Sequence, residues 1–290
     1  MTDDGLPPPI RTGAPAAPQA PVVPAGAAAP TGTALAPLRA RYAHWLGLDE
    51  QQVLADRDEA AEDIRALQLL LRLERTANPS WHRALAMSAT LSAAICLDPR
   101  SEPGGEWFDA VSAYCAGHIR KVTRRGRGAQ WEATAELPGL TLIDGDTQVR
   151  AMLPGRVAEL DKRISKLQVG GTELPVDDPV AAPPAPVLAL FVPVDPPMTA
   201  GKQMAQTGHA GMIAAALLAG SAPPALRAWA AAGCPAVVRR ADVDQYGALQ
   251  ARLATPETAW ADEGLLAVRD AGFTEIAPGT VTVIARAPRN

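Results

Sequence analysis

The chain has 290 residues and a formal net charge of −4, with 48% hydrophobic and 20% charged residues. This length suits one large or two ordinary domains, and the acidic balance excludes a uniformly basic nucleic-acid binder but not a local basic patch. Three scattered cysteines are too few for a disulfide framework, which favours a reducing interior. Without an apolar run of ~20 residues or a signal-peptide pattern, we expect a cytoplasmic protein that does not enter a membrane.

The first 36 residues are expected to form a tail. They include 8 Pro, 10 Ala and 4 Gly and no aromatic residue. Such a segment buries little apolar surface, so burial cannot offset the entropy lost on ordering. We therefore expect residues 1–36 to be disordered and order to begin near Leu38. Residues 37–61 are predicted to be a helical extension, with one helix reaching Trp45 and another starting at Asp49.

The next segment, residues 62–168 (the N-half), has the size of an ordinary domain. Its run Gln68–Glu74 is short and rich in leucine, so periodicity allows either a strand or a helix. Further on, His118–Gly128 holds five fixed positive charges in eleven residues. In a net acidic protein this indicates either a phosphate-binding strip or a solvated hairpin tip. The RNA-binding candidates in this basic segment are Arg120, Lys121, Arg124, Arg125 and Arg127.

A second break in composition separates the N-half from residues 187–290 (the C-half). Residues 169–186 contain five prolines and a Gly-Gly pair, which is typical of an inter-domain linker. Strands are predicted in the C-half at Val187–Val192, Ala236–Arg240, Leu265–Val268 and Val281–Ile284. Helices are predicted at Gly201–Leu218, Ala225–Ala232 and Val243–Leu253, the first of them capped by Thr199. This alternation indicates an α/β layer fold with a mixed sheet.

Two polar clusters in the C-half are candidates for chemistry. Lys202, Gln206 and His209 stand at i, i+4 and i+7 at the start of a helix, so they share one face. That end of a helix favours an anion, although a solvated helix face would give the same pattern. Asp270 ends a predicted strand, at the sheet edge where ligands usually bind. Thr274 lies in the turn that follows, which an Asx turn without catalysis would also explain.

Together the two clusters resemble a known family. The patterns G-K-x-x-A-Q-x-x-H-A and R-D-A-G-x-T-x-I-A-P-G-T-x-T-V resemble the type II peptidyl-tRNA hydrolases over residues 187–288. The resemblance implies cleavage of the ester between a peptide and the 3′ ribose of tRNA, without a metal or organic cofactor. It also implies a compact α/β fold with a four-stranded mixed sheet, usually in a homodimer.

The resemblance implies the following site residues. Catalytic candidates are Lys202, His209, Asp270 and Thr274. Substrate-binding candidates are Gln206, Gly272 and Arg269. Ester hydrolysis needs an oriented water and stabilisation of an oxyanion, tasks that suit Asp270 with Thr274 and Lys202 respectively. His209 would contact the terminal adenosine or tune its neighbours.

Three positions depart from the family pattern. Pro193 and Phe273 stand where arginine is common, and Glu275 where glutamine is common. Fewer positive groups near the site weaken the electrostatic capture of RNA. Either the substrate is held elsewhere or the activity is reduced or altered.

The N-half contains a faint internal repeat of the C-half. At a shift of 119 residues, Arg83 falls on Lys202, Met87 on Gln206 and Thr90 on His209. At a shift of 124, Asp146 falls on Asp270 and Arg150 on Thr274. Unless this similarity is chance, it predicts two similar layered α/β domains. Each would have a mixed sheet of about four strands flanked by helices, and together they would form a pseudo-dimer within a monomer, with a homodimer still open.

The sequence therefore predicts a peptidyl-tRNA hydrolase whose site lies in the C-half and whose RNA surface lies in the N-half. Two alternatives stay open: an adaptor that binds tRNA or protein without catalysis, and an esterase or transferase acting on another aminoacyl ester. Joint retention of the five motif residues favours catalysis.

Overall fold

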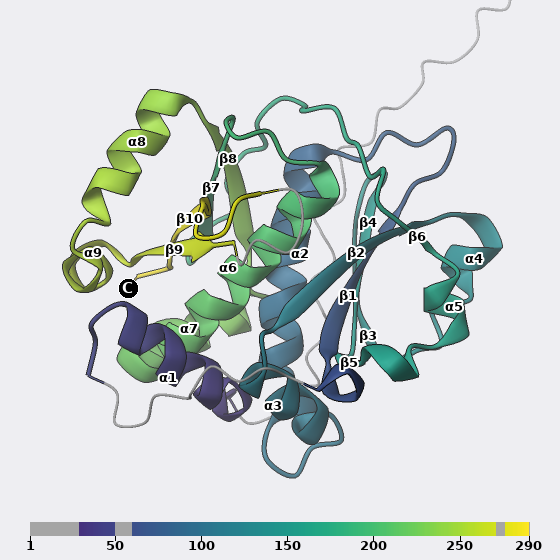
Figure 1. The fold of residues 1–290 in the computed structure, drawn as a ribbon, viewed down its shortest axis with the longest axis horizontal. Helices are drawn as coiled ribbons and strands as arrows, with labels where there is room; N and C mark the ends of the chain where they lie inside the picture. Colours follow the sequence, from purple (N-terminus) through teal and green to yellow (C-terminus); the bar gives the residue numbers. More distant parts are fainter. Residues whose placement is uncertain (1–28, 50–59, 271–275, 290) are drawn as a thin grey trace, which may run out of the picture.

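The computed structural model describes residues 29–49, 60–270 and 276–289. At its centre, helices α2 (Trp81–Leu97) and α6 (Ala200–Ser221) pack against each other between two β-sheets (Figure 1). One sheet belongs to the N-half and the other to the C-half. Shorter helices cover the outer face of each sheet. The expected α/β fold with two layered domains is confirmed.

The two sheets share one strand order. In the N-half it is β3-β4-β1-β2, with two short additions, and in the C-half it is β9-β10-β7-β8. In each half the first two strands are parallel and the other pairings antiparallel. The N-half strands are β1 (Arg65–Arg72), β2 (Arg120–Gly126), β3 (Gly139–Asp144), β4 (Thr147–Met152), β5 (Gly155–Arg156) and β6 (Gln168–Val169). The C-half strands are β7 (Leu188–Pro193), β8 (Ala236–Ala241), β9 (Leu265–Arg269) and β10 (Val281–Arg286).

Local sequence explains where the central elements begin. Ser80 and Thr199 are the N-caps of α2 and α6, and each hydroxyl accepts the backbone N–H three residues on, from Arg83 and Lys202. These residue pairs are related by the shift of 119. The leucine-rich run is a strand, β1, because both of its faces are covered and a continuous apolar run suits such a strand.

The remaining helices lie around this centre. They are α1 (Ala36–Trp45), α3 (Phe108–Ala116), α4 (Gly128–Glu132), α5 (Lys162–Ser165), α7 (Pro223–Ala231), α8 (Val243–Arg252) and α9 (Pro256–Glu263). The predicted C-half strands and helices are all present, and α9 is an addition. No helix in the described parts of the chain combines the length and the apolar character that crossing a bilayer demands.

The helices α2 and α6 run in the same direction and approach closely. The hydroxyl of Thr207 donates to the Leu85 carbonyl at 3.0 Å, and a Cβ on Gly211 would lie 2.3 Å from the Ala89 carbonyl oxygen. Each of these helices also contacts the second strand of the opposite half: α2 packs on β8, and α6 packs on β2. These contacts are reciprocal, as in an interface between two similar subunits.

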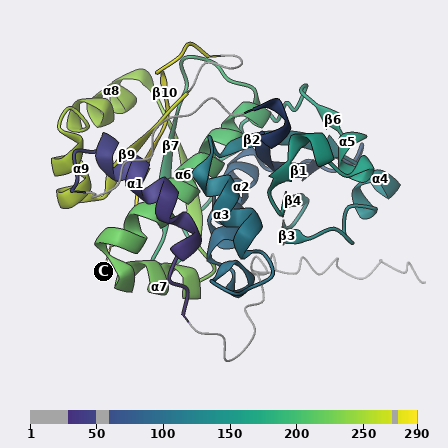
Figure 2. The same ribbon diagram turned by 60° about the horizontal axis from the view of Figure 1, so that its bottom comes forward.

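Helix α1 joins the two halves from below, where it contacts α3 and α6 (Figure 2). The Arg41 guanidinium donates to the Ala116 and Gly117 carbonyls at the end of α3, where a cation is favourable. Ordered structure was expected to begin near Leu38, but it begins before that residue. Leu35 is buried, and Thr31 already donates a backbone hydrogen bond to Glu102. The expected tail before residue 29 and most of the helix expected from Asp49 lie outside the described residues.

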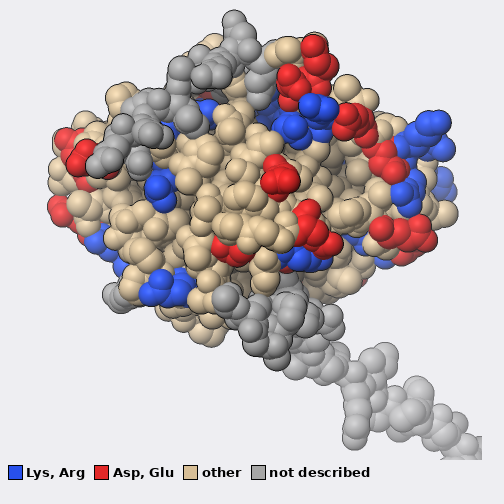
Figure 3. Space-filling view, turned by 90° about the horizontal axis from the view of Figure 1, so that it is seen from below, with Lys and Arg blue, Asp and Glu red and all other residues tan. Residues whose placement is uncertain are grey.

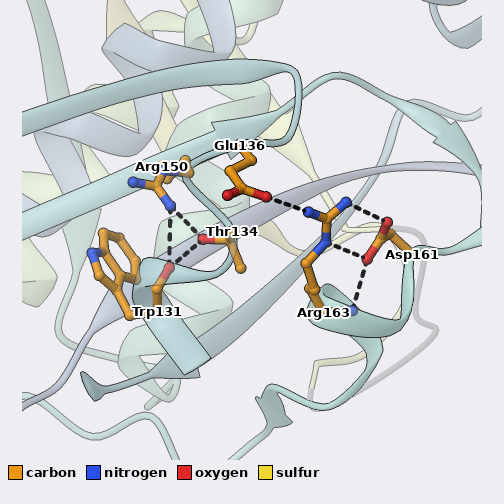
Figure 4. A network of polar contacts seen from close by, with 6 residues as sticks. All are labelled: Trp131, Thr134, Glu136, Arg150, Asp161 and Arg163. Atoms are coloured by element: carbon orange, nitrogen blue, oxygen red, sulfur yellow. Dashed lines mark hydrogen bonds and ion pairs between the residues drawn. The ribbon is translucent and has the colours of Figure 1, made fainter. Parts of the chain in front are cut away.

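The outer face of the N-half sheet is held by an arginine network (Figure 4). Arg150 of β4 donates to the Trp131 carbonyl and to the Thr134 hydroxyl, and its guanidinium lies over the Trp131 ring. The alignment of Arg150 with Thr274 was therefore wrong. Arg150 is a strand residue facing a packed layer, whereas Thr274 follows β9.

The segment expected to be a linker, residues 169–186, is tied down along its length. The Thr172 carbonyl accepts the Gly201 N–H at the start of α6. Asp177 accepts hydrogen bonds from the His82 backbone and ring, and the Val180 carbonyl accepts one from Arg239. The segment therefore helps to fix one half against the other.

Candidate active site

The C-half brings three of the predicted site residues together. The Lys202 ammonium forms an ion pair with Asp270 Oδ2, and the Gln206 amide donates to the same oxygen at 2.8 Å. The Asp270 side chain is 3% exposed and that of Lys202 is 12% exposed. The carboxylate thus lies beneath a lysine that reaches the surface. The motif residues of α6 and the end of β9 therefore lie together.

A fourth residue orients this cluster. The hydroxyl of Thr282 in β10 donates to Gln206 Oε1 at 2.7 Å. Because this bond occupies the carbonyl end of the amide, the NH₂ end faces Asp270. Thr282 is fully buried. It belongs to the second motif, but its helix contact could not be read from the sequence because strand and helix are distant in the chain.

The backbone around Asp270 is pinned where β9 ends. Asp270 N–H donates to the Thr280 carbonyl at 2.9 Å, and Gly279 N–H donates to the Asp270 carbonyl at 2.7 Å. Gly279 has φ +80°, a conformation that favours glycine. The exposed Arg269 guanidinium reaches the Gly279 carbonyl at 3.3 Å. These bonds close the base of the loop that spans residues 270–280.

Two predicted site residues, Gly272 and Thr274, lie outside the described residues, as do Phe273 and Glu275. Of the three departures from the family pattern, only Pro193 is described. It is the buried last residue of β7.

His209 lies two turns along α6 from Lys202, on the same face as predicted. Burial lowers the pKa of His209 well below its usual value, and the positive charges of Lys121 and Lys202 lower it further. The imidazole is therefore neutral near pH 7. A neutral ring can both donate and accept a hydrogen bond, which suits contact with a base or a sugar hydroxyl.

The cluster has the parts for hydrolysis of an ester. It combines a shielded carboxylate, a cation that contacts both carboxylate and solvent, and an amide that fixes the carboxylate. Among the described residues, no three His, Cys, Asp or Glu side chains gather as metal ligands do.

The family comparison agrees with this geometry. Residues 187–290 match the family model described as peptidyl-tRNA hydrolase PTH2. We call this C-terminal part the PTH2 domain, after the family model that it matches. No curated protein matches the chain at a significant level. The family match indicates a hydrolase function that acts on peptidyl-tRNA and is related to translation.

The basic segment of the N-half does not form one exposed strip beside the PTH2 domain. It lies in β2, where successive side chains alternate between the two faces of the sheet. Lys121 and Arg125 face α6 and residues 170–172, while Arg124 on the other face donates to Gln68 and to the Leu167 carbonyl. Arg120 shares that second face by its position in the strand. Only Arg127, just after β2, is well exposed.

Lys121 packs against helix α6 of the PTH2 domain. Its ammonium lies 3.0 Å from the Met212 sulfur and 3.3 Å from the Tyr114 hydroxyl. A Cβ on Gly208 would lie 2.9 Å from the lysine Cδ, so glycine makes room for the side chain. Burial lowers the pKa of Lys121 to about 7. The ammonium is therefore enclosed by protein atoms, although the residue as a whole is partly exposed.

The N-half has a counterpart of the Lys202–Asp270 pair of the PTH2 domain. Arg83 of α2 donates to the Asp144 carboxylate at 2.5 Å, where β3 ends. The earlier alignment of Asp146 with Asp270 was wrong, because β3 and β4 are joined by a turn of only two residues. Met87 and Thr90 stand where the PTH2 domain has Gln206 and His209. The N-half thus keeps a cation and a carboxylate but lacks the long loop.

Proposed function

We propose that the chain hydrolyses the ester between a peptide, or another N-blocked aminoacyl group, and the 3′ end of tRNA, at the C-half site. The observation that carries this proposal is the convergence of Lys202 and Gln206 on the buried Asp270 carboxylate. An adaptor that binds without catalysis has no need for a shielded carboxylate paired with a lysine that is 12% exposed.

In this mechanism Asp270 orients a water molecule and takes up its proton as the water attacks the ester carbonyl. The carbonyl oxygen becomes an oxyanion, and Lys202 donates to it. When this intermediate collapses, the bond between the acyl carbon and the ribose 3′ oxygen breaks. The proton held by Asp270 passes to the leaving 3′ oxygen, so the products are the free peptide acid and the tRNA 3′ hydroxyl. An ammonium has three donors, so Lys202 can keep its contact with Asp270 while it serves the oxyanion. Stabilisation of this kind contributes a factor of about 10² to 10³ in rate. His209 and Arg269 border the site and hold the adenosine end of the substrate.

We further infer that the N-half is a degenerate copy of the PTH2 domain and that the chain holds one active site. The shared strand order, the equivalent N-caps and the Arg83–Asp144 pair support a common origin. In this view the N-half occupies the place of a second protomer, and the chain works as a monomer. Sedimentation of the full chain tests this: a stable dimer would contradict it.

The test of the enzymatic proposal uses purified full-length protein and tRNA charged with an N-acetylated amino acid. We expect release of the N-acetylated amino acid by the wild type and its loss in the Asp270→Asn variant. That variant, prepared in parallel, controls for a contaminating hydrolase. Binding of this tRNA without any turnover would favour the adaptor instead.

A further inference from the structure

The two halves present the same edge of their sheets to the same end of the molecule. Trp81 of α2 contacts Gln203 of α6, and four residues farther along both helices Leu85 contacts Thr207. The two helices are therefore parallel and start at the same end of the molecule. The carboxyl ends of the parallel strand pairs β1–β2 and β7–β8 lie at the helix starts, as in any strand–helix–strand unit. The first turns of α2 and α6 lie at the same end of the molecule (Figure 1). The Lys202–Asp270 pair belongs to this end, to which the N-half also contributes.

At this end the N-half has a groove between the segment after β1 and the start of α4. Its lining residues are Glu74, Arg75, Thr76, Arg127, Gly128, Ala129 and Gln130. Arg75 and Arg127 are both exposed. In the C-half the strand equivalent to β2 is β8, and its exposed Arg240 lies near the same edge. Arginine is the side chain best suited to bind phosphate oxygens.

The acidic residue in the groove is already ion-paired within the protein. Glu74 accepts the Gly128 N–H at 2.8 Å and the Arg72 Nε–H at 2.9 Å. These two donors hold the pKa of Glu74 below its usual value. Arg72 also forms an ion pair with Glu132 at 3.2 Å. Against these two glutamates stand Arg72, Arg75 and Arg127, which leaves a net positive charge at the groove.

The groove is connected to the site through β2. The hydroxyl of Thr123 donates at 2.8 Å to the carbonyl of Gly201, the residue before Lys202. Arg127 lies four residues farther along, which at about 3.3 Å per residue is roughly 13 Å. A bound strand of nucleic acid covers such a distance with a few nucleotides.

We propose that Arg75 and Arg127 bind backbone phosphates of the tRNA close to its 3′ end while the ester lies at Lys202 and Asp270. This inference rests on the proposed function and assigns the RNA surface to a different part of the N-half from the basic segment as a whole. The proposal also explains how the chain can carry Pro193 where arginine is common in the family, because the N-half supplies positive charge for RNA binding.

The face that bears α1, α3 and α7 differs from this groove. Its acidic and basic side chains are interspersed over a largely uncharged surface (Figure 3).

The test compares the full-length double variant Arg75→Ala/Arg127→Ala with Arg227→Ala as matched control. Arg227 is an exposed arginine of α7, at the other end of α6. With N-acetylaminoacyl-tRNA as substrate, we expect KM to rise about tenfold in the double variant and kcat to stay within twofold. Loss of two phosphate contacts should reduce the slope of log KM against log salt by about 1.4 to 1.8.

A second measurement uses uncharged tRNA, whose binding is followed by fluorescence anisotropy and does not depend on hydrolysis. Weaker binding by the double variant, with Arg227→Ala unchanged, supports the surface even if the wild type has no hydrolase activity. Unchanged affinity and salt slope in the double variant, or an equal loss in Arg227→Ala, would overturn the inference while leaving the active site untouched.

Discussion

Arg83 donates to Asp144 at 2.5 Å in the N-half, at the place where Lys202 meets Asp270 in the C-half. Both pairs link the first turn of a central helix to the end of a strand. They differ in their surroundings, because Asp144 is followed by a two-residue turn and Asp270 by the loop 270–280. The Arg83–Asp144 pair has neither a long loop nor an amide partner equivalent to Gln206. It therefore stabilises the fold but lacks the rest of a catalytic site.

Arg83→Met should therefore lower stability without affecting catalysis. The pair is partly buried, with 29% and 14% of the two side chains exposed, so we expect a loss of about 1 to 2 kcal/mol. Urea unfolding measures the loss, and initial rates on N-acetylaminoacyl-tRNA should stay within twofold of wild type. A tenfold fall in kcat would mean that the N-half takes part in the chemistry.

In the C-half, Lys202→Met and Asp270→Asn should each reduce kcat by a factor of about 100 or more, because in the proposed mechanism each change removes half of one catalytic unit. Residues that act as a unit are not additive, so the double variant should be about as slow as the slower single variant. Single-turnover rates of the three variants provide the measurement. Multiplication of the two separate effects would indicate that the side chains act independently.

The C-half could be predicted in detail because its signals are local. A helix period aligns Lys202 with Gln206, and a strand end places Asp270 at the sheet edge. That the two clusters belong to one site was implied by the family resemblance. Helix α9 was missed because Pro256–Glu263 carries only two buried residues, Ala259 and Trp260, and so shows little apolar periodicity.

The N-half was harder because its contacts are not local. The charges of the basic segment were visible, but Lys121 and Arg124 point to opposite faces that α6 and Leu167 cover, which depends on the tertiary fold. Asp146 was chosen over Asp144 because the shortened turn changes the offset between the halves. Thr282 of the C-half was missed because its contact is also not local: its partner, Gln206, is on a helix far away in the chain.

Thr282→Val tests whether the Gln206 amide must be fixed. The change keeps the shape of the side chain but removes the donor to Gln206 Oε1. We expect a kcat about tenfold lower with little change in KM, and a loss of stability of about 1 kcal/mol. Thr282→Ser retains the hydroxyl and should recover most of the rate. Equal rates for valine and serine would show that orientation of the amide does not matter.

Gly211→Ala tests the close approach of the two central helices. A Cβ there would lie 2.3 Å from the Ala89 carbonyl oxygen, a backbone atom that cannot move aside alone. We expect a loss of 1 to 3 kcal/mol from overpacking. Gly247→Ala is the matched control, because Gly247 lies inside α8 with no atom within 4 Å of the added carbon. The control should gain about 0.5 to 1 kcal/mol through helix propensity, measured by urea unfolding.

Lys121→Met tests the buried amine beneath α6. Since burial lowers the pKa of Lys121 to about 7, the unfolded chain holds a proton that the folded chain lacks between pH 7 and about 10. Stability from this group therefore rises with pH in that window, by up to about 1.4 kcal/mol per pH unit. Raised thiol pKa values of Cys115 and Cys234 act in the opposite direction, but only above about pH 8.5.

The measurement is urea unfolding of wild type and Lys121→Met at pH 6.5 and pH 8.5. The other titratable groups around the amine are Tyr114, Cys96, Cys115 and His209, and both proteins contain them. Methionine fills the same channel without a charge, so the variant should be the more stable protein at pH 6.5. Its advantage should shrink by about 1 to 2 kcal/mol at pH 8.5. An advantage that is the same at both pH values would show that Lys121 keeps an ordinary pKa despite its burial.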